Sequence, residues 1–159
     1  MYSIKNSLTG NEYSVKLVVQ RVKNAYVEVD NKVVGKIQQG ILIYLGVLKG
    51  DTEEQAIYLA KKVVEFRIFH DENKKMNRSL LDIQGQALVV SQFTLAADGK
   101  KGHRPSFDLA LEPTQANILY ERFIEEIQKY NIHCERGQFG AYMQVYSQND
   151  GPVTFVMEK

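Results

Sequence analysis

The sequence is poor in the residues that carry several kinds of chemistry. Of its 159 residues, one is cysteine, three are histidine and none is tryptophan. The single cysteine, Cys134, excludes a disulfide within the chain and is typical of a reducing compartment, where it most often serves as a small core residue. The histidines, at positions 70, 103 and 133, lack the spacing of a zinc site, so we expect neither a metal nor a cofactor.

The chain also lacks a strong net charge and a long apolar run. Its formal net charge is +1, so contact with nucleic acid requires a local cluster of cations. Residues 1–14 are polar and contain neither the apolar core of a signal peptide nor a bilayer span. We therefore expect a cytoplasmic protein without membrane contact. Residues 1–14 are an N-terminal extension whose status the sequence does not assign, and residues 15–159 form a single domain.

Apolar patterns predict strands at both ends of the chain. After Gly40, residues 41–47 form an uninterrupted apolar run, which is typical of a strand buried on both faces. Asp30, Asn31 and Lys32 supply the tight turn before residues 33–37. The remaining strands are expected at residues 15–22, 26–29, 87–90, 132–135, 142–147 and 153–157.

Two helices are expected between these strands. The first follows Asp51, which forms a capping-box pattern with Glu54, and its apolar face comprises Ala56, Leu59, Ala60, Val63 and Val64. The second begins near Pro113 and extends to Tyr130, with apolar residues at four-residue spacing. This order predicts an α/β fold: a compact single-domain mixed β-sheet sandwich or barrel with two main helices.

Two short segments are the most informative about function. Ser-Gln-Phe-Thr-Leu, at residues 91–95, follows a buried strand, so its polar groups lie where a sheet meets a loop. Asn-Asp-Gly-Pro, at residues 149–152, contains a Gly-Pro step, where a cis peptide costs only about 0.5–1 kcal/mol. A rigid Gly-Pro can direct two carbonyl oxygens at a ligand. By composition alone, the first segment is also typical of an ordinary strand end and the second of a turn between two strands.

Other candidate groups are open to more than one interpretation. Thr94 could act as a nucleophile, yet no recognisable Ser/His/Asp arrangement supplies it with a base. The cations Lys100, Lys101 and Arg104 lie within five positions, which suits a phosphate clamp and equally suits a solvated turn.

In combination, four segments resemble the D-aminoacyl-tRNA deacylases. The resemblance extends from about Lys16 to the C-terminus and includes Val-Gln-Arg-Val at residues 19–22. Four motifs in the family's order are far more specific than any one of them. The four are Ser-Gln-Phe-Thr-Leu at 91–95, Lys-Lys-Gly-His-Arg-Pro-Ser-Phe at 100–107, Phe-Gly-Ala-Tyr-Met at 139–143 and Asn-Asp-Gly-Pro-Val-Thr-Phe at 149–155.

The resemblance implies an enzyme that hydrolyses the ester bond of D-aminoacyl-tRNA, and also glycyl-tRNA, as chiral proofreading in translation. The ribose 2′-OH of the substrate assists, so the protein supplies orientation and oxyanion stabilisation. The resemblance assigns the catalytic centre to four consecutive residues and the adenosine pocket to three others. Ser91 and Gln92 would orient the ester and the adenosine, the backbone of Phe93 and Thr94 would line the carbonyl site, and Phe139, Gly140 and Met143 would bind the adenosine.

The resemblance further implies a homodimer with a chiral filter. A cis Gly151-Pro152 from one subunit would hold the substrate amino group in the other and exclude an L side chain sterically. Arg21 would brace this turn, and the three cations near residue 100 would face tRNA phosphates. The residues Ala-Ala-Asp-Gly at 96–99 and His103 depart from the family's usual pattern, so the resemblance says least about RNA contacts in this loop.

Two other functions fit the same residues. One is a non-catalytic module that binds a nucleotide or an RNA end, and the other is a conventional esterase that depends on Thr94. Incubation with D- and L-aminoacyl-tRNA separates them from the deacylase, because only the deacylase releases the amino acid stereospecifically.

Overall fold

The computed structural model describes residues 14–159. The extension expected at residues 1–14 lies, apart from Ser14, outside the described residues. The expectation of an α/β fold with a mixed sheet is confirmed: residues 14–159 form a six-stranded sheet, a separate two-stranded hairpin and three α-helices. None of the helices in this part of the chain is long and apolar enough to cross a bilayer.

Strand β1 (Lys16–Val29) organises the sheet by pairing antiparallel with three others. It pairs with β2 (Lys32–Ile37) and β3 (Gly40–Gly46) along one side, and with β8 (Gln144–Glu158) along the other. The expected tight turn before β2 is confirmed, with Asp30 and Asn31 at φ 49° and 62°. The prediction of two short strands at each end of the chain is wrong. β1 and β8 are single long strands, because they pair over almost their whole length.

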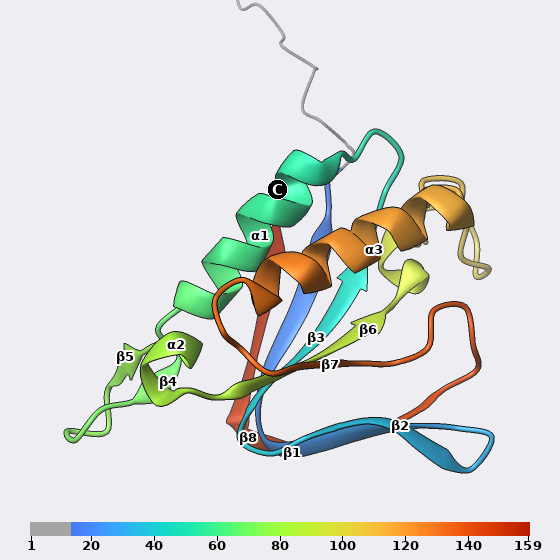
Figure 1. Ribbon diagram of the computed structural model, residues 1–159. Coiled ribbons are helices and arrows are strands. Elements are labelled where there is room, and N and C mark those ends of the chain that lie inside the picture. The colour runs from blue at the N-terminus through green and yellow to red at the C-terminus, as the bar shows by residue number, and fades with distance from the viewer. Residues whose placement is uncertain (1–13) are drawn as a thin grey trace, which may run out of the picture.

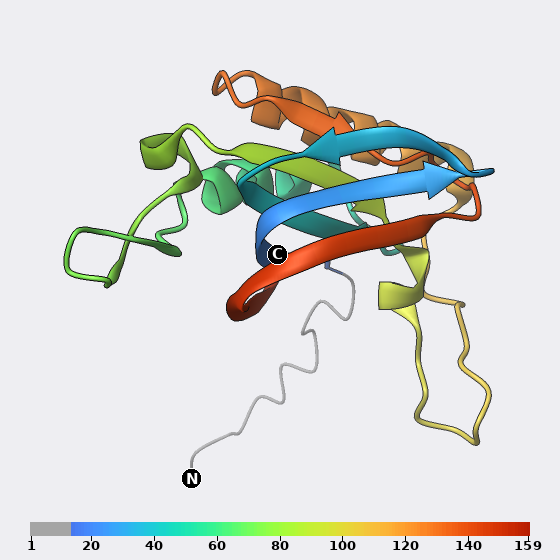
Figure 2. The ribbon, with the colours of Figure 1, turned by 90° about the horizontal axis from the view of Figure 1, so that it is seen from below.

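Two parallel strands extend the sheet, which then curls back on itself. β6 (Gln86–Ser91) pairs with β3, and β7 (Cys134–Arg136) pairs with β6, so the order is β2-β1-β3-β6-β7 with β8 beside β1. A side chain at Gly35 in β2 would collide with the carbonyl oxygen of Arg136 in β7. The two ends of the sheet therefore meet closely, and Figure 2 shows the resulting curled, barrel-like sheet.

Helices α1 (Glu53–Glu65) and α3 (Pro113–Gln128) lie side by side over one face of the sheet (Figure 1). Pro113 opens α3 as expected. The capping box of α1 is one residue later than predicted, since the backbone N–H of Thr52 donates to Oε1 of Gln55. Asp51 instead accepts a hydrogen bond from the backbone N–H of Leu48. A short helix, α2 (Leu80–Ile83), and the hairpin of β4 (Phe69–His70) and β5 (Met76–Arg78) follow α1.

The sheet separates two apolar cores. The larger core lies between the sheet and the helices, and it includes the whole expected face of α1. The smaller core lies inside the curl of the sheet and contains Val22, Ala25, Val27, Ile37, Leu42, Leu88 and Val90. Because β3 and β6 contribute to both cores, their apolar runs are uninterrupted rather than alternating.

Candidate active site

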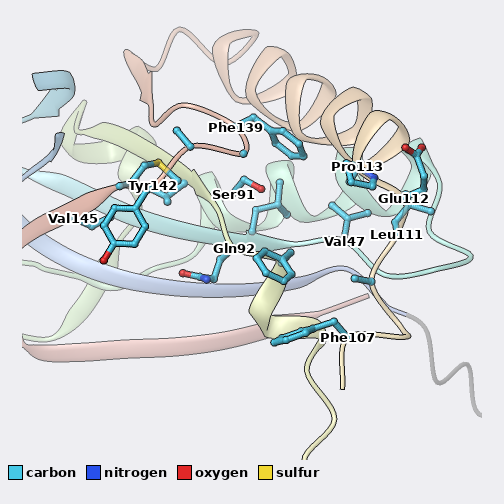
Figure 3. A pocket seen from close by; sticks show the side chains of 18 residues that line it. Val47, Ser91, Gln92, Phe107, Leu111, Glu112, Pro113, Phe139, Tyr142 and Val145 are labelled. Carbon is cyan, nitrogen blue, oxygen red and sulfur yellow. The ribbon is translucent and has the colours of Figure 1, made fainter. Parts of the chain in front are cut away.

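A cavity of about 620 Å³ lies at the carboxyl ends of β3 and β6, beside the start of α3 (Figure 3). It is lined mainly by apolar side chains, with Ser91, Gln92, Glu112 and the Tyr142 hydroxyl as its polar side-chain groups. Concave, largely apolar sites with a few placed polar groups are typical of small-ligand and cofactor binding. Six of the residues predicted from the sequence line it: Ser91, Gln92, Phe93, Phe139, Gly140 and Met143.

The polar corner of the cavity is built by the end of β6. Ser91 is the last residue of β6, and the backbone N–H of Gln92 still donates to the carbonyl of Leu45, 2.8 Å away. The 3-10 helix η1 (Phe93–Ala96) begins immediately afterwards. Because the first N–H groups of a helix have no partner within it, those of Phe93 and Thr94 are available to an oxyanion.

Thr94 differs from the other three expected catalytic residues because its side chain is not among those that line the cavity. Its hydroxyl accepts a hydrogen bond from the Nε2 amide of Gln92. An amide N–H is a donor and cannot remove a proton from a hydroxyl. This geometry weighs against the esterase in which Thr94 is the nucleophile.

The opposite wall of the cavity is held by aromatic packing. The Phe139 ring lies 5.7 Å from the ring of Tyr120, centroid to centroid. Tyr120 is buried and donates its hydroxyl to the carbonyl of Val89 in β6, 3.0 Å away. Burial raises the pKa of the Tyr120 hydroxyl, so it remains a neutral donor. Gly140 turns the chain at φ 75°, a conformation that favours glycine.

Neither cysteine nor a metal centre offers an alternative centre within residues 14–159. Burial raises the pKa of the Cys134 thiol to about 12, so it is protonated at neutral pH and unsuited to nucleophilic attack. Among the described residues, no three His, Cys, Asp or Glu side chains are grouped as a metal site would require.

Gly151 and Pro152 lie away from the cavity, in a bulge of β8. The predicted turn between two strands is wrong: β8 continues, with Asn149 paired to Val22 and Thr154 paired to Gln20, so residues 150–153 bulge outward. The Gly151-Pro152 peptide is cis, and both residues are exposed. The backbone N–H of Val153 donates to Oδ1 of Asn149, 3.1 Å away, which closes the bulge.

Arg21 supports this bulge from inside the molecule. Its side chain is buried, with Nε donating to the carbonyl of Asp150 at 3.0 Å and Nη1 donating to the carbonyl of Ile68 at 2.7 Å. The Asp150 carboxylate lies 3.5 Å from the same Nε. The side chain thus ties the residue before Gly151 to the segment between α1 and β4.

The sheet register separates the bulge from the cavity of the same chain. Leu45 pairs with both Ser91 and Leu17, so Leu17 marks the level of the cavity on β1. Arg21 lies four positions from Leu17, or roughly 13 Å along the strand. β8 is three strands away from β6, which adds roughly 14 Å across the sheet. One chain therefore does not bring its own Gly151-Pro152 to its own cavity.

A loop that we call the basic arm, residues 98–106, projects beside the cavity and is the yellow loop that extends from the body in Figure 2. The backbones of Asp98 and Ser106 pair at its base, with two N–H···O distances of 2.8 Å. Lys100, Lys101 and Arg104 are exposed, and no ion pair within residues 14–159 involves them.

Sequence reasoning missed several residues of the site. Phe107 and Tyr142 line the cavity and lie within the motifs quoted for the family resemblance, yet neither was assigned a role. Glu112 and Pro113 reach it only because α3 begins there (Figure 3). Their helix-start pattern was visible, but the contact of that helix end with β6 is non-local.

Comparison with known proteins now identifies the family. Residues 18–158 match the family described as D-Tyr-tRNA(Tyr) deacylase. The D-aminoacyl-tRNA deacylase of Persephonella marina is 57% identical over 141 residues, covering 89% of this chain and 95% of the relative. The enzyme of the same name from Pseudoalteromonas translucida is 58% identical over 138 residues, covering 87% and 95%.

Solved structures agree with this result. The c-Myc DNA unwinding element binding protein superposes with a TM-score of 0.85 at 40% identity, covering 91% of this chain and 98% of that one. A probable eukaryotic D-amino acid tRNA deacylase superposes with a TM-score of 0.80 over 92% of this chain and all of that chain, at 18% identity, which supports the fold alone. The chain belongs to the D-aminoacyl-tRNA deacylase family.

Proposed function

We propose that this enzyme hydrolyses the ester bond of D-aminoacyl-tRNA in the cavity at the end of β6, and that a second copy of the chain supplies the chiral filter. The observation that supports this proposal is the separation of two built features. A cavity with a polar corner lies at one end of the sheet, and an exposed, braced Gly151-Pro152 lies at the other.

In this mechanism the cavity positions the substrate and stabilises developing charge. Hydrolysis adds water across the ester, breaks the bond between the acyl carbon and the ribose oxygen, and releases the amino acid and the free tRNA end. Ser91 and Gln92 orient the ester and the adenosine, while the N–H groups of Phe93 and Thr94 stabilise the oxyanion. The neighbouring ribose hydroxyl assists attack with the high effective concentration of an intramolecular group. Phe139, Gly140 and Met143 bind the adenosine.

Selectivity in this proposal is steric. The carbonyl oxygens at Gly151 and Pro152 hold the substrate amino group, leaving space for a D side chain and none for an L side chain. Glycine has no side chain to exclude, so glycyl-tRNA is also a substrate. The proposal includes a cytoplasmic location, where charged tRNA is made and used.

The direct test is the release of amino acid from three substrates. We expect rapid hydrolysis of D-alanyl-tRNA, measurable hydrolysis of glycyl-tRNA and negligible hydrolysis of L-alanyl-tRNA. Binding of D-alanyl-tRNA without release would support the non-catalytic module instead. Rapid cleavage of L-alanyl-tRNA, or no cleavage of glycyl-tRNA by an enzyme active on the D substrate, would contradict the steric filter.

The homodimer is tested by mixing two defective proteins. Gln92→Ala damages the cavity, whereas Gly151→Val damages the bulge, because a Cβ at Gly151 would lie 2.6 Å from Cγ2 of Val153 and φ is 139°. If the filter acts across a two-fold interface, random exchange of subunits restores about a quarter of the sites. No restoration between exchanged subunits, or a monomer with full stereospecific activity in sedimentation, would contradict the proposal.

A further inference from the structure

Two exposed aromatic rings lie together at the rim of the cavity. Phe93 is 58% exposed and Phe107 is 37% exposed, and their ring centroids are 5.1 Å apart with an interplanar angle of 59°. Both residues line the cavity. Exposed apolar side chains that gather at one place, rather than singly, typically mark a binding surface.

The position of this aromatic pair connects the cavity to the basic arm. Phe93 opens η1 directly after Gln92, and Phe107 directly follows Ser106, which closes the base of the arm. Lys100 and Lys101 lie two and three positions beyond Asp98, or roughly 7–10 Å in an extended chain. Figure 3 shows Phe107 on the opposite side of the cavity from Tyr142, the other exposed aromatic residue of the rim.

This order of groups matches the chemistry of a single-stranded RNA end. Proteins bind single strands by stacking bases on aromatic side chains and by tracking the backbone with cations. An adenosine in the cavity leaves the preceding nucleotide at the rim, and the strand then continues toward Lys100, Lys101 and Arg104. The Asp98 carboxylate at the base of the arm accepts the backbone N–H of Lys100, at 2.9 Å, and the three cations of the arm outnumber its single negative charge.

We propose that the Phe93 and Phe107 rings form the stacking platform for the base that precedes the terminal adenosine of the substrate. The inference rests on the proposed function, because it takes the cavity to be the adenosine site. It adds a second recognition site, through which the enzyme distinguishes an RNA end from an isolated adenosine ester.

The test compares three D-alanyl esters of increasing length: adenosine, the trinucleotide CCA and whole tRNA. Base stacking on an aromatic side chain is worth about 1–3 kcal/mol. Phe107→Ala should therefore lower kcat/KM about 5- to 150-fold for the CCA and tRNA esters. The same variant should lose much less activity on the adenosine ester, because Phe107 also lines the cavity but this ester carries no preceding base to stack on it. Circular dichroism checks that the variant is folded.

Matched variants separate stacking from simple packing. Phe107→Leu keeps an apolar side chain without a flat face and should show the same loss, whereas Phe107→Trp should retain the activity on the CCA ester. Tyr142→Ala removes a ring that is 88% exposed on the other rim, and we expect its effect to be equal on all three esters.

Several results would overturn this inference. Equal losses on the adenosine and CCA esters would show that Phe107 only supports the cavity, and unchanged rates would show that it contributes nothing. A loss confined to the longer esters in Tyr142→Ala would place the RNA over the other rim. Failure of the proposed function gives a different result: the unmodified enzyme would then hydrolyse none of the three D-alanyl esters.

Discussion

Replacing Arg21 with methionine should reduce both the stability and the stereoselectivity of the enzyme. Methionine keeps much of the buried volume but donates no hydrogen bond, so the carbonyls of Asp150 and Ile68 lose a charged donor at 3.0 and 2.7 Å. Each hydrogen bond to a charged group contributes about 1.5–3 kcal/mol. After partial compensation by water at the half-buried Asp150, we expect the free energy of unfolding to fall by about 2–4 kcal/mol.

The loss of selectivity follows from the same two contacts. Arg21 holds the residue before Gly151, so without it the bulge can shift and the carbonyl oxygens lose their positions. We expect the ratio of kcat/KM for D-alanyl-tRNA over L-alanyl-tRNA to fall at least tenfold, which corresponds to about 1.4 kcal/mol. Urea unfolding and deacylation of both substrates, at a temperature where the variant is folded, measure the two effects.

Arg122→Met is the matched control. Arg122 is a partly exposed arginine that pairs with Glu53, Glu125 and Glu126 at 3.5–3.7 Å, on the helix layer and away from the bulge. Surface ion pairs contribute about 0–1 kcal/mol each, so this variant should lose little stability and no selectivity. A folded Arg21→Met protein with the D/L ratio of the unmodified enzyme would refute the bracing role.

Three further predictions concern the nucleophile, the basic arm and a buried carboxyl. Thr94→Ala should retain substantial deacylation, whereas a D-alanyl ester of 2′-deoxyadenosine should react far more slowly than the adenosine ester. A folded Thr94→Ala variant that binds substrate without turnover would instead support Thr94 as the nucleophile. Replacing Lys100, Lys101 and Arg104 with glutamine should weaken tRNA binding, and the slope of log K against log salt concentration should become shallower by about 0.7 per lost phosphate contact. An unchanged slope would show that the basic arm is only solvated surface. Burial raises the pKa of Asp51 to about 6, and its Oδ1 has no hydrogen-bond partner among the described residues. Because this folded-state pKa exceeds the unfolded value, the free energy of unfolding falls as pH rises from about 4 through 6. Asp51→Asn should therefore raise the free energy of unfolding by about 1–3 kcal/mol at pH 8 and by little at pH 4. An equal increase at both pH values would contradict this prediction.

Local patterns in the sequence predicted the elements whose structure is decided locally. The apolar face of α1, the start of α3 at Pro113 and the doubly buried run of β3 were all confirmed. The capping box is shifted by one residue because the Asp51 carboxylate accepts a hydrogen bond from the backbone N–H of Leu48 instead. Single-residue capping choices of this kind depend on contacts from outside the helix.

Non-local pairing accounts for the larger differences. Residues 142–157 read as two strands around a turn, because Asn-Asp-Gly-Pro has turn composition. Pairing with β1 on both sides of the bulge keeps β8 continuous, and only the structure shows that Arg21 lies behind it. The distance between Gly151 and the cavity, and the contact of Phe107 with Phe93, likewise depend on the fold as a whole.

The pairing of β1 with β8 has a consequence for synthesis of the enzyme on the ribosome. Gln20 on β1 hydrogen-bonds to Thr154 on β8, 134 positions later in the chain. Contacts between such distant residues form slowly, and β8 is translated long after β1. Strand β1 therefore remains unpaired with β8 while the cavity residues from β6 to η1 are already translated. The bulge is translated after β6 and η1, so a chain that has not yet reached β8 carries these cavity residues without the Gly151-Pro152 bulge.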